Sequence, residues 1–342
     1  MSKANNWLPS ARARTVALPF VLLVATTMSS TVVAEDATRG GAVSVMLEND
    51  IFAGRDGHYT NGLGFMWVAA RGTSAPRWAE QMAALAPWLP DEGELRHGYM
   101  FGQSMFTPRD KENPNPPATD RPYAGWLYGT FGIGKDSDRQ FDLIAVTLGV
   151  VGPASLAEST QKTAHRLTGS AQPEGWSTQL HNELGVVFTA QRSWRNVVHG
   201  SVGGFSFDVT PYVGGTLGNV FTYGSTGTAI RFGNQLPSDL GIPRIQPANL
   251  GSGEFSPIST AGWYLFVGLE GRAVARNIFL DGNTFRDSRS VDRKPWVGDI
   301  QYGLVYHFRS VRISFTNVLR TKEYRTQDTR DRFGALTVSV DY

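Results

Sequence analysis

The stretch Asn61-Gly62-Leu63-Gly64-Phe65-Met66-Trp67-Val68-Ala69 places a large apolar side chain at every second position. Leu63, Phe65 and Trp67 fall on one face, whereas Thr60 and two glycines fall on the other. A two-residue period is typical of a β-strand, because successive side chains point to opposite faces of the sheet. The stretch therefore predicts a strand with one strongly apolar side.

The same period recurs along the chain, and the opposite faces carry polar, aromatic and small residues. A soluble sandwich would bury the apolar faces against a second sheet, whereas a membrane barrel would turn them to lipid and keep polar groups inside. The other alternating segments are Leu127/Phe131/Ile133, Ile144/Val146/Leu148/Val150, Trp263/Leu265/Val267/Leu269 and Ile300/Tyr302/Leu304/Tyr306.

The end of the chain favours the barrel. The segment 336–342 alternates in the same way and finishes on an aromatic residue, Tyr342. A last strand that pairs with the first leaves no sheet edge exposed to lipid. We therefore predict an all-β fold, a transmembrane antiparallel β-barrel of about twelve strands. The strands are expected near 41–52, 59–71, 95–107, 123–134, 140–151, 184–195, 203–217, 219–233, 259–274, 295–308, 310–321 and 333–342.

The first residues have the features of an export signal. Three basic residues precede the apolar run Val16–Ala25, which is too short to span a membrane as a helix. Val32-Val33-Ala34 supplies a small-residue cleavage pattern. We expect a cleaved signal peptide over 1–34, followed by a single outer-membrane barrel domain over 35–342.

Composition excludes several classes of function. The 342 residues include 32 Lys and Arg, 30 Asp and Glu, and no Cys. Lys3, Arg12 and Arg14 belong to the leader, so 29 of the 32 basic residues remain. This balance argues against a nucleic-acid partner, and nothing in the sequence indicates an obligate protein partner. The lack of cysteine excludes disulfides, thiolate metal sites and a cysteine nucleophile.

The longest predicted external loop contains a candidate general base. If the mature N-terminus is periplasmic, the loops after odd-numbered strands face the cell exterior. The segment 155–169 of one such loop predicts a short helix that ends at Gly169. Gln161 and His165 then lie one turn apart on the same face. A histidine in this setting can take a proton from water, although a solvated loop helix is the alternative.

The first hairpin contains a candidate cation site. Strict alternation places Asp50 and Thr60 on the lumen side and Asn49 on the outer side, unless a bulge at the strand end re-aims it. A carboxylate with neutral oxygen ligands suits calcium better than zinc. Capping of the loop by these side chains is the alternative.

Two further segments leave alternatives open. Trp78, Met82, Leu85 and Leu89 recur at helical spacing within 75–90, which fits either a short amphipathic helix at the membrane surface or ordinary loop packing. The segment 234–258 is long for a periplasmic connection, so a missed pair of strands there would change the count.

The common hydrolase motifs G-x-S-x-G and H-E-x-x-H are absent. One alternative function is an outer-membrane phospholipase with a Ser-His-Asn site, in which Ser104 or Ser159 would be the nucleophile. Another is a passive pore with a wet, polar lumen.

Taken together, several motifs make the chain resemble the lipid A 3′-O-deacylases, outer-membrane barrels that remove the 3′-linked acyloxyacyl chain of lipid A. The motifs are Glu48-Asn49-Asp50, Tyr59-Thr60-Asn61-Gly62-Leu63, Gln103 to Pro108, Asp120-Arg121-Pro122-Tyr123-Ala124-Gly125-Trp126, Gln161-x-x-x-His165, Gly175-Trp176 and Gln179. The resemblance implies twelve strands, lipopolysaccharide as substrate, and calcium-dependent ester hydrolysis near the outer leaflet, with a histidine that activates water.

The resemblance also implies roles for individual residues. Five positions match the family's site directly: Asn49, Asp50, Thr60, Gln161 and His165. Asp50 would bind Ca²⁺ and the others would serve catalysis. The family's lysine after the third strand can be placed on Lys111 only across a gap. The family's acidic residue six positions after the histidine falls on Ala171, so Glu174 is the candidate substitute.

Overall fold

In a computed structural model, the described residues are 41–50, 58–137, 139–234, 236–237 and 258–342. The expected signal peptide therefore lies outside the described residues, as does most of 234–258. The strands are β1 (Ala42–Asn49), β2 (His58–Val68), β3 (Glu94–Thr107), β4 (Ala124–Asp136), β5 (Gln140–Val151), β6 (Glu183–Trp194), β7 (Val198–Val202), β8 (Phe205–Gly218), β9 (Phe221–Gly233), β10 (Ile258–Asn277), β11 (Trp296–Arg309), β12 (Val311–Arg320) and β13 (Asp331–Asp341). The helices are α2 (Arg77–Ala84), α3 (Ala157–Thr168) and α4 (Ile278–Asp281), with 3-10 turns η2 (Pro153–Ser155) and η3 (Gly175–Thr178).

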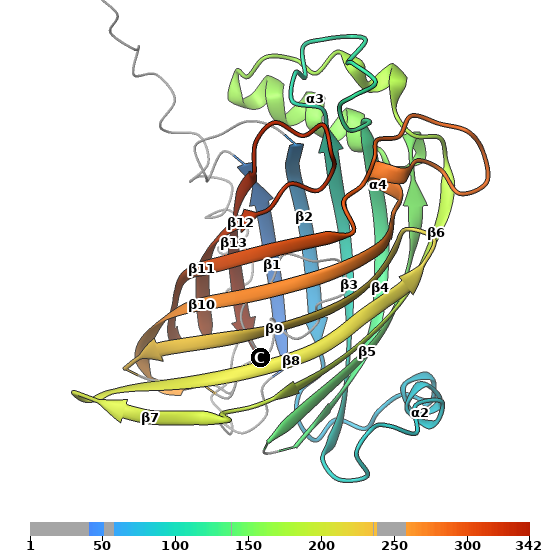
Figure 1. The fold of residues 1–342 in the computed structure, drawn as a ribbon. Helices are drawn as coiled ribbons and strands as arrows, with labels where there is room; N and C mark the ends of the chain where they lie inside the picture. The colour runs from blue at the N-terminus through green and yellow to red at the C-terminus, as the bar shows by residue number, and fades with distance from the viewer. Residues whose placement is uncertain (1–40, 51–57, 138, 235, 238–257) are drawn as a thin grey trace, which may run out of the picture.

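The strands form one closed antiparallel barrel (Figure 1). Consecutive strands are neighbours except for β6 and β7, β13 pairs with β1 from Ala42↔Asp341 to Asn49↔Gly334, and β6 pairs with β8. The predicted contact between the last strand and the first is confirmed. Every strand consequently has hydrogen-bonded neighbours around the wall, which is what a barrel needs in order to leave no open edge.

The wall is twelve-stranded, as predicted, because β6 and β7 are two parts of one strand. Both pair with β8, through Ser193↔Tyr212 and Val198↔Val209. From Ser193 to Val198 the chain advances by five residues, whereas the paired part of β8, from Val209 to Tyr212, advances by three. The extra residues form a bulge that interrupts the strand. Asn196 within this bulge has φ of 52°. Alternation did not predict β7, which lies in the expected gap between 195 and 203.

The two faces of the wall differ as the alternation predicted. On β11, Ile300, Tyr302 and Leu304 are exposed on the outer face, whereas Asp299 and Gln301 are buried in the lumen. The large exposed apolar residues of other strands, such as Phe101, follow the same pattern. None of the helices in the described part of the chain is long and apolar enough to span a membrane.

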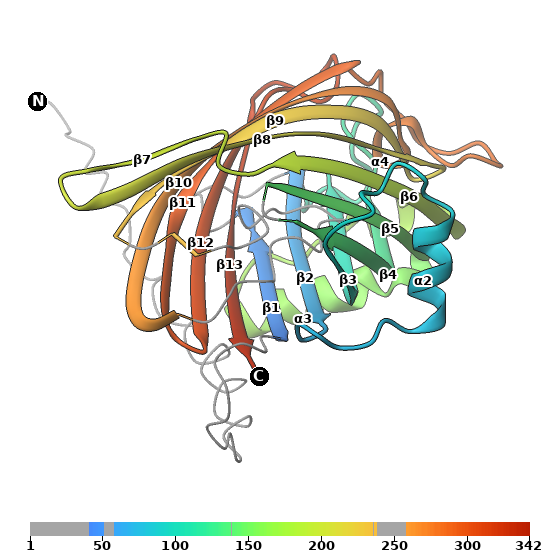
Figure 2. The ribbon, with the colours of Figure 1, turned by 90° about the horizontal axis from the view of Figure 1, so that it is seen from below.

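The helices lie at opposite ends of the barrel. Figure 1 shows α3 and α4 at one end and α2 at the other, and the view along the barrel in Figure 2 places α2 outside the ring of strands. The helix predicted over 155–169 is present as α3. Of the two alternatives for 75–90, a helix forms, although α2 is shorter than that segment. The short α4 was not predicted.

Candidate active site on the outer wall

Helix α3 packs against the outer face of the wall. Met105 follows Phe101 on the outward row of β3, yet it is buried because it clusters with Ala157 of α3 and with Trp176. The helix ends at Gly169, whose φ of 69° is left-handed, as the predicted C-terminal glycine requires. The loop that carries Gln161 and His165 therefore folds back over β3 and β4 instead of extending away from the barrel.

Gly125 of β4 allows this close approach. A Cβ atom at this position would lie 2.2 Å from both the Ala157 Cβ and the Ser155 Oγ. Gln103 on the outer face of β3 donates a 2.6 Å hydrogen bond from Nε2 to the carbonyl oxygen of Ser155. A glycine below the turn and an amide beside it thus fix the start of α3.

Gln161 is held in one orientation by Trp176. The indole Nε1 donates to Gln161 Oε1 at 2.7 Å, and each side chain is only 1% exposed. Because the oxygen accepts this bond, the amide nitrogen Nε2 is left facing elsewhere, and it is buried without a hydrogen-bond partner among the described residues. Buried polar groups without partners are rare in native proteins, so this donor indicates a ligand position.

His165 is oriented by a backbone carbonyl. Its Nδ1 lies 2.5 Å from the carbonyl oxygen of Ala171. A carbonyl can only accept, so Nδ1 carries the proton and Nε2 of the neutral ring has the free lone pair. Ala171 is the position where the resemblance implied a carboxylate. The candidate substitute Glu174 has an exposed side chain, and its backbone N–H donates to the carbonyl of Lys111.

Lys111 lies beside Asp50. Its Nζ is 3.8 Å from Asp50 Oδ2, and both side chains are buried. Burial lowers the pKa of Lys111, and the Asp50 carboxylate partly offsets this effect. The Tyr123 hydroxyl donates to the Lys111 carbonyl at 2.9 Å, and the Tyr123 ring packs on Trp176. The alignment across a gap thus identified a lysine that contacts Asp50, and Tyr123 connects the loop of Lys111 to that of Gln161.

Thr60 lies in a β-bulge of β2. Tyr59 pairs with Phe106 and Asn61 with Met105, so Thr60 is the extra residue. The alternation behind the lumen-side prediction for Thr60 therefore breaks at that residue. The structure describes the backbone of Thr60 but not the direction of its side chain. No bulge re-aims Asn49, because it pairs in register with Asn61.

The register of β1 to β4 shows where Asn49 lies relative to α3. Asn49, Asn61, Met105 and Gly125 are successive partners on β1 to β4. Asn49 therefore lies in the row that leads to the first residues of α3. Asn49 at the end of β1, and Gln161 and His165 on α3, therefore lie at the same end and on the same side of the barrel.

A family model described as outer membrane protein LpxR matches residues 20–342. The chain belongs to the LpxR family. Among solved structures, LpxR from Salmonella typhimurium is 19% identical with a TM-score of 0.71, and the match covers 87% of this chain and 99% of that one. The beta domain of the Bordetella autotransporter BrkA is 10% identical with a TM-score of 0.42. No curated protein sequence matches the chain significantly.

Because the LpxR family is a family of outer-membrane proteins, the barrel lies in the outer membrane. The outer face, rich in exposed Phe, Leu and Ile, is the lipid-facing surface. We infer that the α3 end is extracellular and the α2 end periplasmic, because outer-membrane barrels place their longer loops outside. The site around α3 lies on the lipid-facing side of the wall at this end (Figure 1).

The donors near Asp50 fit a hard cation in type. Calcium takes about six to eight oxygen ligands, and Asp50 and Asn49 offer carboxylate and amide oxygens. Within the described residues, no three His, Asp or Glu side chains gather closely enough to hold a metal ion by themselves. Residues 51–57, which follow Asp50 directly, lie outside the described part of the chain.

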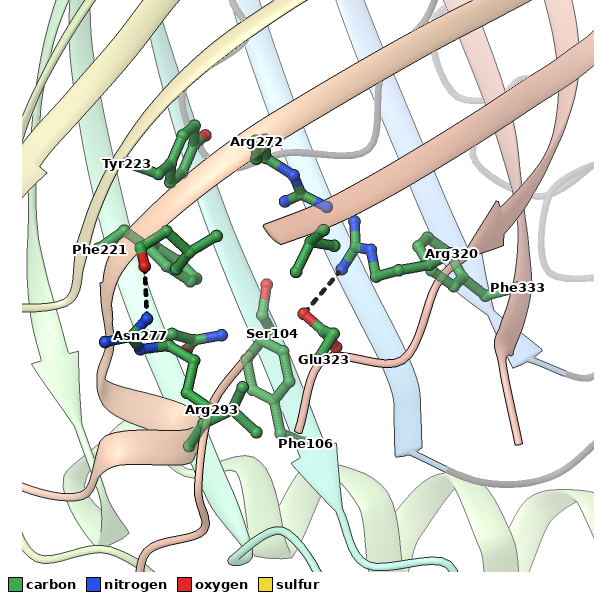
Figure 3. A pocket seen from close by; sticks show the side chains of 13 residues that line it. Ser104, Phe106, Phe221, Tyr223, Arg272, Asn277, Arg293, Arg320, Glu323 and Phe333 are labelled. Atoms are coloured by element: carbon green, nitrogen blue, oxygen red, sulfur yellow. Dashed lines mark hydrogen bonds and ion pairs between the residues drawn. The ribbon is translucent and has the colours of Figure 1, made fainter. Parts of the chain in front are cut away.

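The lumen of this LpxR-family barrel contains a network of charged side chains. Asp299 accepts from Arg272 at 2.8 Å and from Arg320 at 2.9 Å, and Arg320 also lies 3.5 Å from Glu323. Figure 3 shows Arg272, Arg320 and Glu323 around a cavity, together with Ser104. The volume of this cavity is about 60 Å³. A second cavity, of about 560 Å³, is lined by Glu270, Asp299 and Arg320 of the same network.

The serines of the phospholipase alternative do not meet His165. Ser104 lines the luminal cavity, whereas α3 packs on the outer face. Ser159 donates from Oγ to the Leu156 carbonyl at 2.9 Å, and its position six residues before His165 puts the two on different sides of α3. Neither hydroxyl is arranged as a nucleophile activated by this histidine.

Proposed function

We propose that this protein hydrolyses the 3′-O-linked acyl chain of lipid A in the outer leaflet. Membership of the LpxR family supports this proposal, as does the position of His165 and Gln161 on the lipid-facing side of the wall. The observation that carries it is the contact between His165 Nδ1 and the Ala171 carbonyl, because it leaves Nε2 as the basic nitrogen.

In the proposed reaction, neutral His165 acts as general base through Nε2. It takes a proton from a water molecule whose oxygen attacks the ester carbonyl carbon. The tetrahedral intermediate then collapses, the bond to the sugar oxygen breaks, and the proton held on Nε2 passes to that oxygen. The products are a free fatty acid and a 3′-hydroxyl.

Gln161 supplies the second element of the mechanism. Its buried Nε2 has hydrogen atoms to donate, and the Trp176 bond keeps Oε1 turned away from the substrate. We infer that Nε2 donates to the attacking water or to the ester carbonyl oxygen, where negative charge develops. Asn49 and Thr60 are the predicted helpers that orient water or substrate.

Calcium is part of the proposal, with Asp50 as its carboxylate ligand. When bound, the ion would polarise the ester carbonyl and stabilise the developing oxyanion. The Lys111 ammonium is 3.8 Å from the same carboxylate, so a bound cation would share Asp50 with this lysine.

Mass spectrometry of lipid A tests the proposal. Cells that make a 3′-acylated lipid A are grown with and without the protein, and also with a His165→Gln variant. The expected result is loss of the 3′-acyl groups only with the wild type. An unchanged lipid A mass in cells whose outer membrane contains the folded wild-type barrel would refute the proposed activity.

A further inference from the structure

Helix α2 packs on the lipid-facing side of the wall near the periplasmic end. Its Trp78 donates from Nε1 to the Tyr99 hydroxyl at 3.1 Å. The Trp78 ring also lies 5.6 Å from the ring of Tyr99 and 6.3 Å from that of Phe131, measured between centroids. Tyr99 and Phe131 are paired residues on the outward rows of β3 and β4. The helix is thus attached to the outer surface of the barrel.

A row of charged residues crosses the outer face directly below these aromatic rings. Lys135, Asp142 and Arg192 are successive partners on β4, β5 and β6. Their side chains point to the same outer face as those of Phe131, Val146 and Phe188 on the same three strands. Arg192 Nε donates to Asp142 Oδ1 at 2.7 Å. Charged groups on a lipid-facing barrel surface are costly near the bilayer midplane and tolerated only near the interface. The row therefore marks the periplasmic edge of the hydrophobic belt.

The segment after α2 covers this charged row. Arg192 Nη2 donates to the Trp88 carbonyl at 2.6 Å, and Lys135 Nζ donates to the Asp91 carbonyl at 3.1 Å. Ile133 lies one row higher on the same face and is fully buried, although Phe131 above it is 42% exposed. The carbonyl oxygens of Trp88 and Asp91 thus accept hydrogen bonds from two of the three charged residues.

Two large apolar side chains of this segment are more than half exposed. Leu85 is 81% exposed and Trp88 is 53% exposed. Both belong to a segment that is bound to the lower edge of the lipid-facing belt, where Phe131 and Phe188 are also exposed. Tryptophan is enriched at the interface between membrane and water, and amphipathic helices bind there through their apolar residues.

From these contacts we propose that residues 76–92 form a collar that inserts into the periplasmic leaflet. Leu85 and Trp88 lie at the boundary between the acyl chains and the headgroups of its phospholipids. The continuity of this surface with the lipid-facing belt identifies lipid as the occupant. The collar fixes the depth of the barrel and shields the charged row, and it is independent of the proposed hydrolysis.

Spin labelling can test the collar directly because the chain has no native cysteine. Single-cysteine variants Leu85→Cys and Trp88→Cys are labelled with a nitroxide and reconstituted into vesicles of phosphatidylethanolamine and phosphatidylglycerol. Relaxation by oxygen is compared with relaxation by a water-soluble nickel chelate. Phe188→Cys, in the lipid-facing belt, and Glu80→Cys, two residues from Trp78 on a different side of α2, are the controls.

The collar predicts an oxygen-to-nickel ratio at both positions that is several-fold above the Glu80 label and at or below the Phe188 label. A ratio at both positions equal to that of the Glu80 label, in barrels that are folded by circular dichroism, would overturn it. A periplasmic protein as the true occupant would also give that result, because the vesicles contain no such partner. Two labelled positions keep the test valid if one variant fails to fold.

Discussion

The indole nitrogen of Trp176 donates to the side-chain oxygen of Gln161 at 2.7 Å, inside a cluster closed to solvent. An amide can rotate to exchange its oxygen and nitrogen, and this bond selects the orientation in which the nitrogen remains available. Trp176 is therefore a positioning residue in the proposed site.

Trp176→Phe should lower the rate of lipid A deacylation by about fivefold, because one net hydrogen bond of about 1 kcal/mol no longer fixes the Gln161 amide. The rate is measured by mass spectrometry on reconstituted protein. Trp88→Phe, at the opposite end of the barrel, is the matched control and should retain the wild-type rate. Equal rates for the two variants would argue against the positioning role.

His165→Gln should reduce the rate by about 10²- to 10⁴-fold, the usual contribution of a general base. Glu174→Gln should change it little, since the Ala171 carbonyl orients the ring and the Glu174 side chain is exposed. Both rates come from the same time course of 3′-acyl release. A loss of rate in Glu174→Gln as large as that in His165→Gln would show that the carboxylate orients the base.

Gly125→Ala should displace α3 and abolish most of the activity while the barrel stays folded, because the new Cβ would meet Ala157 at 2.2 Å. Gly129→Ala is the matched control on the same face of β4, since its Cβ would have no neighbour closer than 3.9 Å. Circular dichroism checks the barrel and acyl release checks the site. Full activity in Gly125→Ala would contradict the packing of α3 described above.

Removal of calcium should stop 3′-acyl release, and added calcium should restore it. Asp50→Asn should weaken this restoration, because the variant loses the carboxylate charge that would bind the ion. The measurement is the rate as a function of free calcium after exhaustive chelation. A wild-type rate that does not respond to chelation would remove calcium from the proposal and leave the role of His165 untouched.

The protein should conduct no steady ion current in planar bilayers, because charged side chains such as Arg320 and Asp299 occupy the lumen as ion pairs between neighbouring strands. Arg320→Ala leaves Asp299 with one guanidinium partner fewer and should destabilise the barrel by about 3 kcal/mol or more. Its midpoint of denaturation by urea measures this. Stable porin-like conductance by the wild type would favour the passive-pore alternative.

The barrel was largely predictable from the sequence because alternation is a local property of each strand. Leu63, Phe65 and Trp67 predicted β2, and the final alternating segment predicted its own pairing with β1. β7 was missed because a bulge separates it from β6, and alternation does not extend through a bulge. The same limit applies to Thr60, the extra residue in the bulge of β2.

The sequence singled out candidate site residues, but it did not predict where they lie relative to the wall. Alternation assigned Asp50 to the lumen side, and no periodicity indicates on which face a loop helix such as α3 will pack. That face depends on Gly125 and Gln103, whose contacts with the turn before α3 are long-range. Both residues belong to the motifs that carried the family resemblance, which was the available signal.

The packing of α3 outside the barrel determines how a substrate would arrive. A lipid would reach His165 by two-dimensional diffusion within the leaflet, without crossing a gate or entering a channel. The rate of turnover would then follow the mole fraction of lipid A in the membrane surface and not its bulk concentration. An enzyme of this design can be limited by the fluidity and order of the leaflet around it.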